Sequence, residues 1–369
     1  MTLHQLDGGG YPVLVGRGSL SRLPDLLGEW ASSSGYAVIS DSNVAALYGG
    51  EVVEALQGAG LSAHLFTFPA GEASKKREEW ARLGDALLEY GLDRRGGVIA
   101  LGGGVTGDLA GFVAATYLRG VTFVQVPTSL LAMVDASVGG KTGIDVPAGK
   151  NLVGAFHAPK LVVADPNLLA TLPPEERLQG AVEAAKHGAV RDAGHWAEVT
   201  AGVEQIRSGD PGYLERLVAR SVALKADVVR TDFRESGLRQ ILNFGHSLGH
   251  AVEAASGYAM PHGSAVALGM IMEAEVGEAM GVTQVGTTRA LEEFAHDAGL
   301  PTRIPPYATV RELMARTATD KKNRDGALRF VLLKALGEVD PGEGWSHGVD
   351  PRLVETILER RIQSHSPAF

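Results

Sequence analysis

Short runs of apolar residues alternate with amphipathic stretches through the first half of the chain. Runs rich in Val, Ile, Phe and Tyr and bounded by turn-forming residues predict strands, and apolar positions that recur every three or four residues predict helices. We expect strands at residues 11–15, 36–39, 63–68, 97–101, 122–126 and 161–164, with helices at 43–56, 74–90 and 106–117 between them. This alternation predicts an α/β fold with a mostly parallel sheet, whose ligands bind at the carboxyl ends of the strands.

From residue 173 onward the strand pattern fades and helical periodicity dominates. Helices are expected at 175–190, 213–229, 238–255, 264–280, 288–298 and 351–360, with one short strand at 327–333. We therefore predict two domains, an α/β domain at residues 1–172 and a mainly α-helical domain at residues 173–369. Residues 127–159 break the rhythm of the first half, and a glycine-rich connection of this length is usually functional.

Composition narrows the classes of protein and of site. Hydrophobic residues make up 45% of the 369 and charged residues 21%, which excludes an intrinsically disordered chain. The absence of cysteine excludes disulfide frameworks, thiolate metal sites and cysteine nucleophiles, so a metal would have to bind His, Asp or Glu. The net charge of −9 argues against nucleic acid or an anionic membrane as a partner. With no signal-like N-terminus and no uncharged stretch long enough to cross a bilayer, the expected location is the cytoplasm.

A glycine-rich turn connects one predicted strand to the following helix. Gly102, Gly104 and Gly107 fit the spacing G-x-G-x-x-G, in which backbone N–H groups at the start of a helix approach a pyrophosphate. The acidic residue expected about 20 positions later, which would bind a ribose, is absent, because no acid lies between Asp108 and Asp135. Two interpretations stay open: a dinucleotide site that is not an ordinary Rossmann domain, or a glycine turn with only a structural role.

Basic residues on glycine-rich segments form a second candidate feature. Lys141, Lys150 and Arg119 suit the binding of phosphate oxygens, although they could also be solvated surface charges. A P-loop ending at Lys141 is excluded, because the first glycine of that motif would fall on Asp135. One further basic pair is either a solvated turn or an additional anion ligand: Lys321 and Lys322.

Polar residues also recur at helical spacing in the second half of the chain. Four of them would share one face of a continuous helix: Arg239, Asn243, His246 and His250. An amphipathic helix normally presents apolar residues to the core on such a face, so a polar stripe there indicates a functional site. His262 follows shortly afterwards, which brings three histidines within 17 residues.

A metal site is the chemistry that these histidines suit best. Two histidines and one carboxylate bind Zn²⁺ and leave coordination positions open, as in catalytic sites. Spacing favours His246 and His250 as the pair but does not decide it against His262. Among many carboxylates Glu183 stands out, because it lies three residues before Lys186 in an otherwise small and apolar helix.

In their order along the chain, these motifs resemble the 3-dehydroquinate synthase family, one of the sugar phosphate cyclases. The similarity extends over nearly the whole chain and is densest at residues 102–159 and 225–263. It is carried by the glycine turn at 102–108, Arg119-Gly120, Val-Pro-Thr-Ser-Leu-Leu-Ala at 126–132, Asp-Ala-Ser-Val-Gly-Gly-Lys-Thr-Gly at 135–143, Gly-Lys-Asn at 149–151 and the block 243–250. Departures from the family pattern at 180–185 and 231–235 leave the expected ligands in place.

The resemblance implies two cofactors. A divalent metal, usually Zn²⁺ with Co²⁺ as an alternative, would bind Glu183, His246 and His262, and His250 would then line the substrate pocket. NAD would bind Gly71, Glu72, Lys75, Gly104, Val105, Thr106, Gly107, Asp108, Thr128, Ser129, Lys141, Lys150 and Thr171.

The resemblance also implies a substrate and a reaction. The substrate is a sugar acid phosphate, 3-deoxy-D-arabino-heptulosonate 7-phosphate, which becomes 3-dehydroquinate and phosphate by transient NAD oxidation, β-elimination, re-reduction and intramolecular aldol closure. This is a step of the shikimate pathway to aromatic amino acids. Substrate contacts would fall on Asp135, Lys141, Asn151, Lys186, Lys225, Arg239, Asn243, His250 and one of Lys321 or Lys322. Arg119 resembles an arginine that reaches the neighbouring subunit's phosphate site, which implies a homodimer.

Three other functions are weighed against this one. A cyclase acting on a substrate without a carboxylate would leave Arg239 and Lys225 without a purpose. A metal-dependent polyol dehydrogenase would need no set of phosphate-binding lysines and would accumulate NADH. A non-catalytic NAD- or metal-sensing module would not combine an anion site around Arg119, Lys141 and Lys150 with a histidine-rich metal site.

Overall fold

The computed structural model describes residues 3–318 and 328–362, which form two compact units. The first unit consists of Met1–Arg177 and Ser208–Phe233, and the second of Leu178–Arg207 and Arg234–Phe369. By compactness the segment 208–233 groups with the first unit, although it follows residue 173 in sequence. The domain limits 1–172 and 173–369 stay a prediction.

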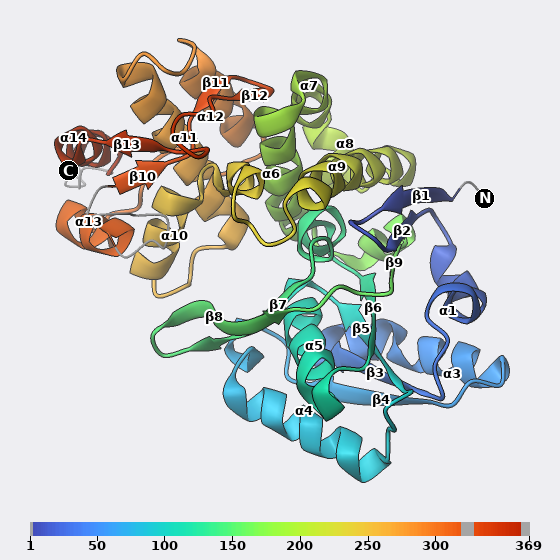
Figure 1. The fold of residues 1–369 in the computed structure, drawn as a ribbon. Coiled ribbons are helices and arrows are strands. Elements are labelled where there is room, and N and C mark those ends of the chain that lie inside the picture. Colours follow the sequence, from blue (N-terminus) through green and yellow to red (C-terminus); the bar gives the residue numbers. More distant parts are fainter. Residues whose placement is uncertain (1–2, 319–327, 363–369) are drawn as a thin grey trace, which may run out of the picture. The chain divides into compact units, whose positions relative to one another are not determined.

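A seven-stranded, mostly parallel sheet forms the centre of the first unit, as the strand–helix alternation predicts (Figure 1). Its strands, in spatial order, are β1 (His4–Asp7), β2 (Pro12–Val15), β9 (Leu161–Ala164), β6 (Thr122–Pro127), β5 (Gly97–Gly102), β3 (Tyr36–Asp41) and β4 (Ala63–Phe68). Only β1 pairs antiparallel, with β2. The strands β5 and β9 are buried along their whole length, which explains their uninterrupted apolar sequence.

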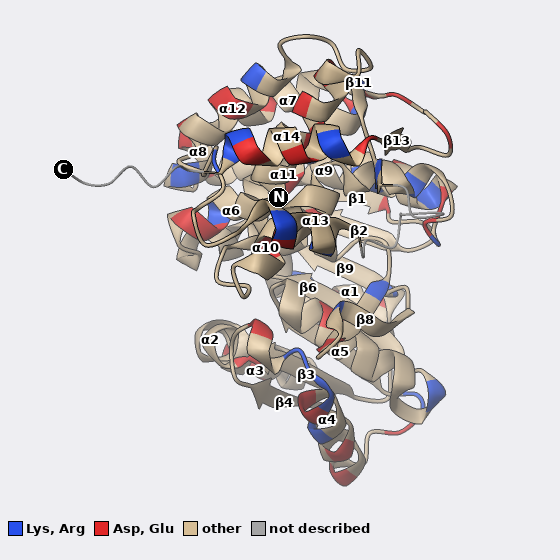
Figure 2. Ribbon diagram, turned by 90° about the vertical axis from the view of Figure 1, so that its left-hand side faces the viewer, with Lys and Arg blue, Asp and Glu red and all other residues tan. Residues whose placement is uncertain are grey.

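Helices cover both faces of this sheet. The handedness of the connections between parallel strands shows which helices share a face. The connections through α1 (Leu23–Trp30) and α3 (Gly50–Gly58) lead toward β4, whereas those through α4 (Arg77–Tyr90) and α5 (Gly104–Thr116) lead away from it. Because parallel crossovers are right-handed, opposite directions place the two pairs on opposite faces. Contacts between α1 and α3 and between α4 and α5 agree with this assignment. Figure 2 shows acidic and basic residues along α4, whereas the central strands β5, β6 and β9 contain no charged residue.

The expected long loop at 127–159 is largely ordered. It contains the short helix η5 (Ala132–Ala136) and an antiparallel hairpin of β7 (Lys141–Val146) and β8 (Gly149–Phe156). The two strands approach closely, since a Cβ atom added to Gly154 would lie 2.1 Å from the Thr142 carbonyl oxygen. Glycines that permit this approach interrupt the apolar alternation, so the sequence pattern conceals the strands. Helix α9 (Pro211–Thr231) packs beside η5 and β1.

The second unit is mainly helical, as predicted. Its helices are α6 (Pro174–Arg191), which begins in the first unit, α7 (Ala193–Ala201), α8 (Val203–Ser208), α10 (His246–Ala255), α11 (His262–Ala279), α12 (Thr287–Asp297), α13 (Val310–Ala318) and α14 (Pro351–Arg361). Short strands β10 (Leu328–Phe330), β11 (Leu333–Ala335), β12 (Glu338–Val339) and β13 (His347–Val349) form two small ladders. Within residues 3–318 and 328–362, no helix combines the length and the apolar character that crossing a membrane requires.

The continuous helix predicted at 238–255 is wrong. A 3₁₀ helix, η7 (Leu238–Asn243), ends before Gly245, and α10 begins anew at His246. Gly245 has φ +80°, and a Cβ atom there would lie 2.5 Å from Cγ of Met270. Arg239 and Asn243 therefore do not continue the helical face of His246 and His250, because the chain turns between them.

Candidate metal centre and cofactor-binding residues

Three side chains on three helices of the second unit converge on one point. Glu183 projects from α6, and His246 and His262 are the first residues of α10 and α11. Oε1 of Glu183 lies 3.7 Å from Nε2 of His246 and 3.6 Å from Nε2 of His262. One ligand atom from each of the three residues lies within 4.8 Å of the others. Two imidazole nitrogens and one carboxylate oxygen in this arrangement fit a divalent metal with coordination positions left open.

The second nitrogen of each histidine ring faces an acceptor. Nδ1 of His246 lies 3.1 Å from the Phe244 carbonyl oxygen, and Nδ1 of His262 lies 3.4 Å from Oε2 of Glu253. With a proton on each Nδ1, each Nε2 can present its lone pair to a metal bound beside Glu183, an arrangement typical of metal-binding histidines. No sequence signal marked Glu253 beyond its position three residues after His250.

Charges within the cluster shift the pKa values of its groups. Burial lowers the pKa of His246 well below its usual 6.5, and the positive charge of Lys186 lowers it further. Burial also opposes protonation of His262, but interactions with the carboxylates of Glu183 and Glu253 outweigh it and raise its pKa to about 9. Glu183, which is 1% exposed, forms an ion pair with Lys186 one turn along α6.

A second group of metal-ligand type shares His262. Ligand atoms of His250, Glu253 and His262 also lie within 4.8 Å of one another. The ring centroids of His246 and His250 are 5.1 Å apart, so the three histidines that the sequence singled out lie together. A neutral imidazole has one lone pair in its ring plane, so His262 can serve only one of the two groups at a time.

Other expected substrate residues of the second unit lie on neighbouring segments. Arg239 is buried on η7, and His250 is exposed on α10. Nδ2 of Asn243 donates a hydrogen bond to Oε1 of Glu235 at 2.7 Å. Glu235 has φ +59°, and sequence reasoning missed it because it lies in a segment noted only for departing from the family pattern. Lys321 and Lys322 lie outside the described residues.

The glycine turn of the first unit lies at the point where the strand order reverses. From β3 the chain passes to β4 on one side of the sheet, and from β5 it passes to β6 on the other. Ligands of open α/β sheets bind at such a point. Asp41 ends β3 there, and Oγ1 of Thr106 donates a hydrogen bond to its Oδ2 at 3.2 Å. No acid follows the glycines within the expected distance in sequence, but Asp41, which precedes them, lies beside the turn.

Except for Lys141 and Lys150, which lie on the hairpin of β7 and β8, the expected NAD residues follow the carboxyl ends of parallel strands. Gly71, Glu72 and Lys75 follow β4; Gly104, Val105, Thr106, Gly107 and Asp108 follow β5; Thr128 and Ser129 follow β6; Thr171 follows β9. Nζ of Lys75 lies 2.5 Å from Oδ2 of Asp108. Burial opposes the charge on Lys75, but Asp108 and Glu72 outweigh it and raise its pKa. Nζ of Lys150, on β8, lies 3.3 Å from Oε1 of Glu72, so the hairpin of β7 and β8 contacts the expected NAD residues that follow β4.

The expected substrate residues of the first unit are only partly brought together. Nζ of Lys225, on α9, donates to the carbonyl oxygen of Asp135 at 2.6 Å and to its Oδ1 at 2.7 Å. Lys141, Asn151 and Arg119 lie on exposed segments, and the last two have positive φ angles of +54° and +69°. These positions leave the substrate roles of all five residues as predictions.

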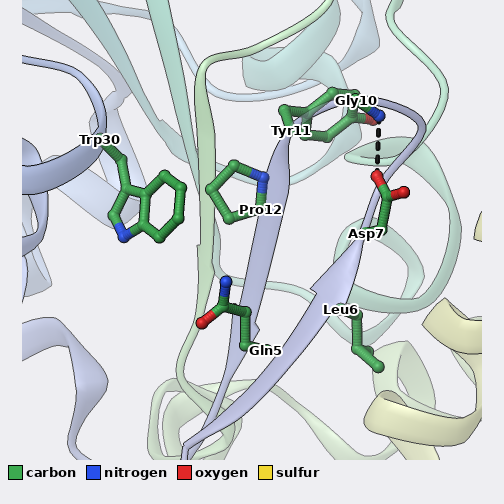
Figure 3. Close-up of a pocket in the computed structure, with 7 residues that line it drawn as sticks. All are labelled: Gln5, Leu6, Asp7, Gly10, Tyr11, Pro12 and Trp30. Carbon is green, nitrogen blue, oxygen red and sulfur yellow. Dashed lines mark hydrogen bonds between the residues drawn. The ribbon is translucent and has the colours of Figure 1, made fainter.

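A separate hollow of the first unit carries none of the expected residues. It has a volume of about 410 Å³ and is lined by Gln5, Leu6, Asp7, Gly10, Tyr11, Pro12 and Trp30 (Figure 3). Its carboxylate, Asp7, accepts hydrogen bonds from the backbone of Gly9 and Gly10, which lower its pKa. The carboxylate thus stabilises the turn between β1 and β2, and we assign no ligand to this hollow.

Comparisons of sequence match most of the chain, in both units. A family model described as 3-dehydroquinate synthase N-terminal matches residues 65–179, and one described as 3-dehydroquinate synthase C-terminal matches residues 180–323. A 3-dehydroquinate synthase of Symbiobacterium thermophilum is 47% identical over 335 residues, covering 89% of this chain and 92% of the relative. One of Xylella fastidiosa is 42% identical over 366 residues, covering 96% and 91%.

Solved structures share the fold. A 2-epi-5-epi-valiolone synthase from Streptomyces hygroscopicus, with NAD⁺ and Zn²⁺ bound, is 28% identical with a TM-score of 0.86, covering 95% of this chain and 96% of that one. A 2-deoxy-scyllo-inosose synthase complexed with carbaglucose-6-phosphate, NAD⁺ and Co²⁺ has a TM-score of 0.89 at 24% identity, covering 98% and 100%. The likeness to the second protein concerns the fold alone.

Proposed function

Because this chain belongs to the 3-dehydroquinate synthase family, we propose that it converts 3-deoxy-D-arabino-heptulosonate 7-phosphate into 3-dehydroquinate and phosphate. The observation that carries the proposal is the cluster of Glu183, His246 and His262, whose donor atoms suit a catalytic divalent metal. The reaction has no net redox change, so the protein's task is to orient one substrate and to stabilise charge while bonds change.

The metal would be held by Nε2 of His246, Nε2 of His262 and a carboxylate oxygen of Glu183. A divalent cation lowers the pKa of hydroxyl groups that bind to it. We propose Zn²⁺, which the 28%-identical valiolone synthase contains, with Co²⁺ as a substitute. Lys186 would keep the charge of Glu183 balanced while the site is free of metal, since their side chains pair on one helix.

NAD would be held by groups at the carboxyl ends of β3, β4, β5, β6 and β9. Bound NAD⁺ takes up a hydride from an alcohol carbon and can return it. We propose that backbone N–H groups at the start of α5 bind the pyrophosphate and that Asp41 accepts hydrogen bonds from a ribose. Asp41 is suited to this, because it is already oriented by the amides of Asn43 and Val44 and by Thr106.

The buried guanidinium of Arg239 is the group we assign to the substrate carboxylate. A planar, permanently charged donor matches a carboxylate in a bidentate manner, which a lysine cannot do. The substrates of cyclases that make inosose or valiolone lack this carboxylate, so R239A distinguishes the two substrate classes. It should raise KM for the heptulosonate phosphate, and unchanged KM and kcat would favour a substrate without a carboxylate.

Two further parts of the proposal concern the protein's state in the cell. We infer a homodimer in which Arg119 reaches the partner's phosphate site, because Arg119 is exposed on a turn with an unusual positive φ angle. We infer a cytoplasmic location, since the pathway of the proposed reaction supplies aromatic amino acids. Sedimentation of wild type and R119A tests the dimer. The activity of mixtures of R119A with a metal-site variant tests whether two subunits share the phosphate site.

The decisive experiment supplies purified protein with the heptulosonate phosphate, a catalytic amount of NAD⁺ and Zn²⁺. We expect inorganic phosphate and the cyclic product in equal amounts, with no accumulation of NADH. Accumulation of NADH without phosphate would instead indicate a polyol dehydrogenase. Absence of both products with the metal and NAD⁺ bound would overturn the proposal.

A further inference from the structure

Both histidines of the metal cluster are the first residues of their helices. The first N–H groups of a helix have no partner within it, so something else must accept their hydrogen bonds. In α11 the acceptor is Gln179 of α6, whose Oε1 lies 2.7 Å from the Ser264 backbone nitrogen and 3.2 Å from its Oγ. Gln179 lies one turn before Glu183 on α6, so two of the ligand-bearing helices are connected directly.

In α10 the acceptor is Glu273 of α11. Its Oε2 accepts from the backbone nitrogen of Gly245 at 2.7 Å, and its Oε1 accepts from those of Ser247 and Leu248 at 3.0 and 3.3 Å. The residue that precedes α10 is Gly245, which has no side chain with which to cap the helix itself. Glu273 is 0% exposed, and a negative charge at a helix N-terminus is favourable. A carboxylate from the neighbouring helix therefore replaces the missing local cap.

The backbones of α10 and α11 also approach each other closely at two glycines. A Cβ atom added to Gly269 would lie 1.8 Å from the Gly245 carbonyl oxygen, and one added to Gly249 would lie 2.8 Å from the Ala265 carbonyl oxygen. The helices meet backbone to backbone at these glycines, and the hydrogen bonds of Glu273 join the same two helices at the first turn of α10. His246 is the residue between the amides that Glu273 holds.

We propose that Glu273 is a positioning residue of the metal centre, which holds the first turn of α10 so that Nε2 of His246 faces Glu183. This inference rests on the metal site proposed above. Without the carboxylate, the buried N–H groups of Gly245, Ser247 and Leu248 would have no acceptor, which is unfavourable. The first turn of α10 would then move to find other hydrogen-bond partners. A movement of that turn carries His246 with it, because His246 lies inside it.

The test compares E273Q with E278Q, a matched substitution on the same helix. Glu278 accepts a hydrogen bond from the Thr288 backbone nitrogen at 2.8 Å and so caps α12, which carries no metal ligand. Zn²⁺ affinity is measured by competition with a chromophoric chelator, and the visible spectrum of the Co²⁺-loaded protein reports the ligand geometry. We expect E273Q to weaken Zn²⁺ binding by about 10-fold, as replacing groups that orient metal ligands does, and to change the Co²⁺ spectrum. E278Q should leave both unchanged.

The outcomes separate this inference from the function on which it rests. If wild type binds no metal, the proposed metal site fails first. If wild type binds Zn²⁺ and E273Q binds it equally well with the same Co²⁺ spectrum, the positioning role of Glu273 is wrong. E273M, which fills the same space with an apolar chain, is measured as a second variant. Failure of both variants to fold would assign Glu273 to the fold and overturn the inference.

Discussion

Nδ1 of His262 lies 3.4 Å from Oε2 of Glu253, while Nε2 of the same ring lies 3.6 Å from Glu183. The two carboxylates thus face opposite edges of one imidazole. With its proton on Nδ1, His262 donates to Glu253 and presents its lone pair to the proposed metal. Glu253 is buried on α10, so its charge is held in place against the ring.

We predict that Glu253 strengthens metal binding through His262. E253Q keeps an acceptor but loses the charge, and E253A loses both. Zn²⁺ affinity should fall by about 10-fold in E253Q and by up to about 100-fold in E253A, as measured by competition with a chelator. The control is E312Q, which removes an exposed carboxylate that pairs with Arg316 on α13. Equal affinity in wild type and E253A would contradict the prediction.

We predict one tightly bound ion per chain. The two groups of ligand type share His262, whose neutral ring can donate one lone pair, so occupation of one group excludes the other. Dialysis against excess Zn²⁺ followed by elemental analysis should give one ion per chain in wild type and in H250A. H262A should retain none and release no phosphate from substrate, whereas H296A, a change of an exposed histidine, should behave as wild type. Two ions per wild-type chain would rule out mutual exclusion.

We predict that Asp41 contributes to NAD⁺ binding through its charge. D41N keeps a side-chain oxygen that can accept from the amides of Asn43 and Val44, so the start of the following helix is preserved. Hydrogen bonds to a charged group contribute about 1.5–3 kcal/mol, so NAD⁺ affinity should fall by about 10-fold or more. Calorimetric titration measures this, with D93N, at an exposed turn, as the control. Wild-type affinity in D41N would remove Asp41 from the cofactor site.

We predict that His157 makes the first unit less stable in mild acid. Burial is the main reason why its pKa lies below the usual 6.5. The unfolded chain therefore takes up a proton at higher pH than the folded chain, and stability present above pH 6.5 is lost as the pH falls through the lowered pKa. The free energy of unfolding should fall by at most about 1.4 kcal/mol per pH unit from this group.

Urea unfolding at several pH values between 5 and 7.5 checks this, with H157Q as the variant. Glutamine can still donate to the Val121 carbonyl oxygen, which lies 3.1 Å from Nε2 of His157, but it does not titrate in this range. H157Q should show a shallower fall of stability with acid than wild type. Parallel pH profiles of the two proteins would show that His157 is not responsible.

Regular secondary structure was the part of the fold most accessible from sequence. Apart from β1, which was not predicted because His-Gln-Leu-Asp has no apolar run, the strands of the sheet have short apolar runs. Their connecting helices have a period near 3.6, and both patterns depend on neighbours within a few residues. The hairpin of β7 and β8 escaped prediction because Gly143 and Gly154, which let its strands approach, interrupt the pattern. The continuous helix predicted at 238–255 was wrong because polar residues recur at helical spacing on both sides of Gly245, although the backbone is not helical at Gly245.

The sequence by itself determined the alternation of strands and helices, the glycine turn at the start of α5, and the kinds of side chain available for a metal and for phosphate. Those features arise from local backbone preferences and from the chemistry of single residues. Only the tertiary structure decided that Asp41 lies beside the glycine turn, since this depends on the order of β3 and β5 in the sheet. It also decided that His246 and His262 face Glu183, that Glu253 faces the other edge of His262, and that Gln179 and Glu273 accept hydrogen bonds from the first turns of α11 and α10. Such contacts join positions far apart in the chain, and their geometry follows from how α6, α10 and α11 pack, which no spacing along the sequence contains.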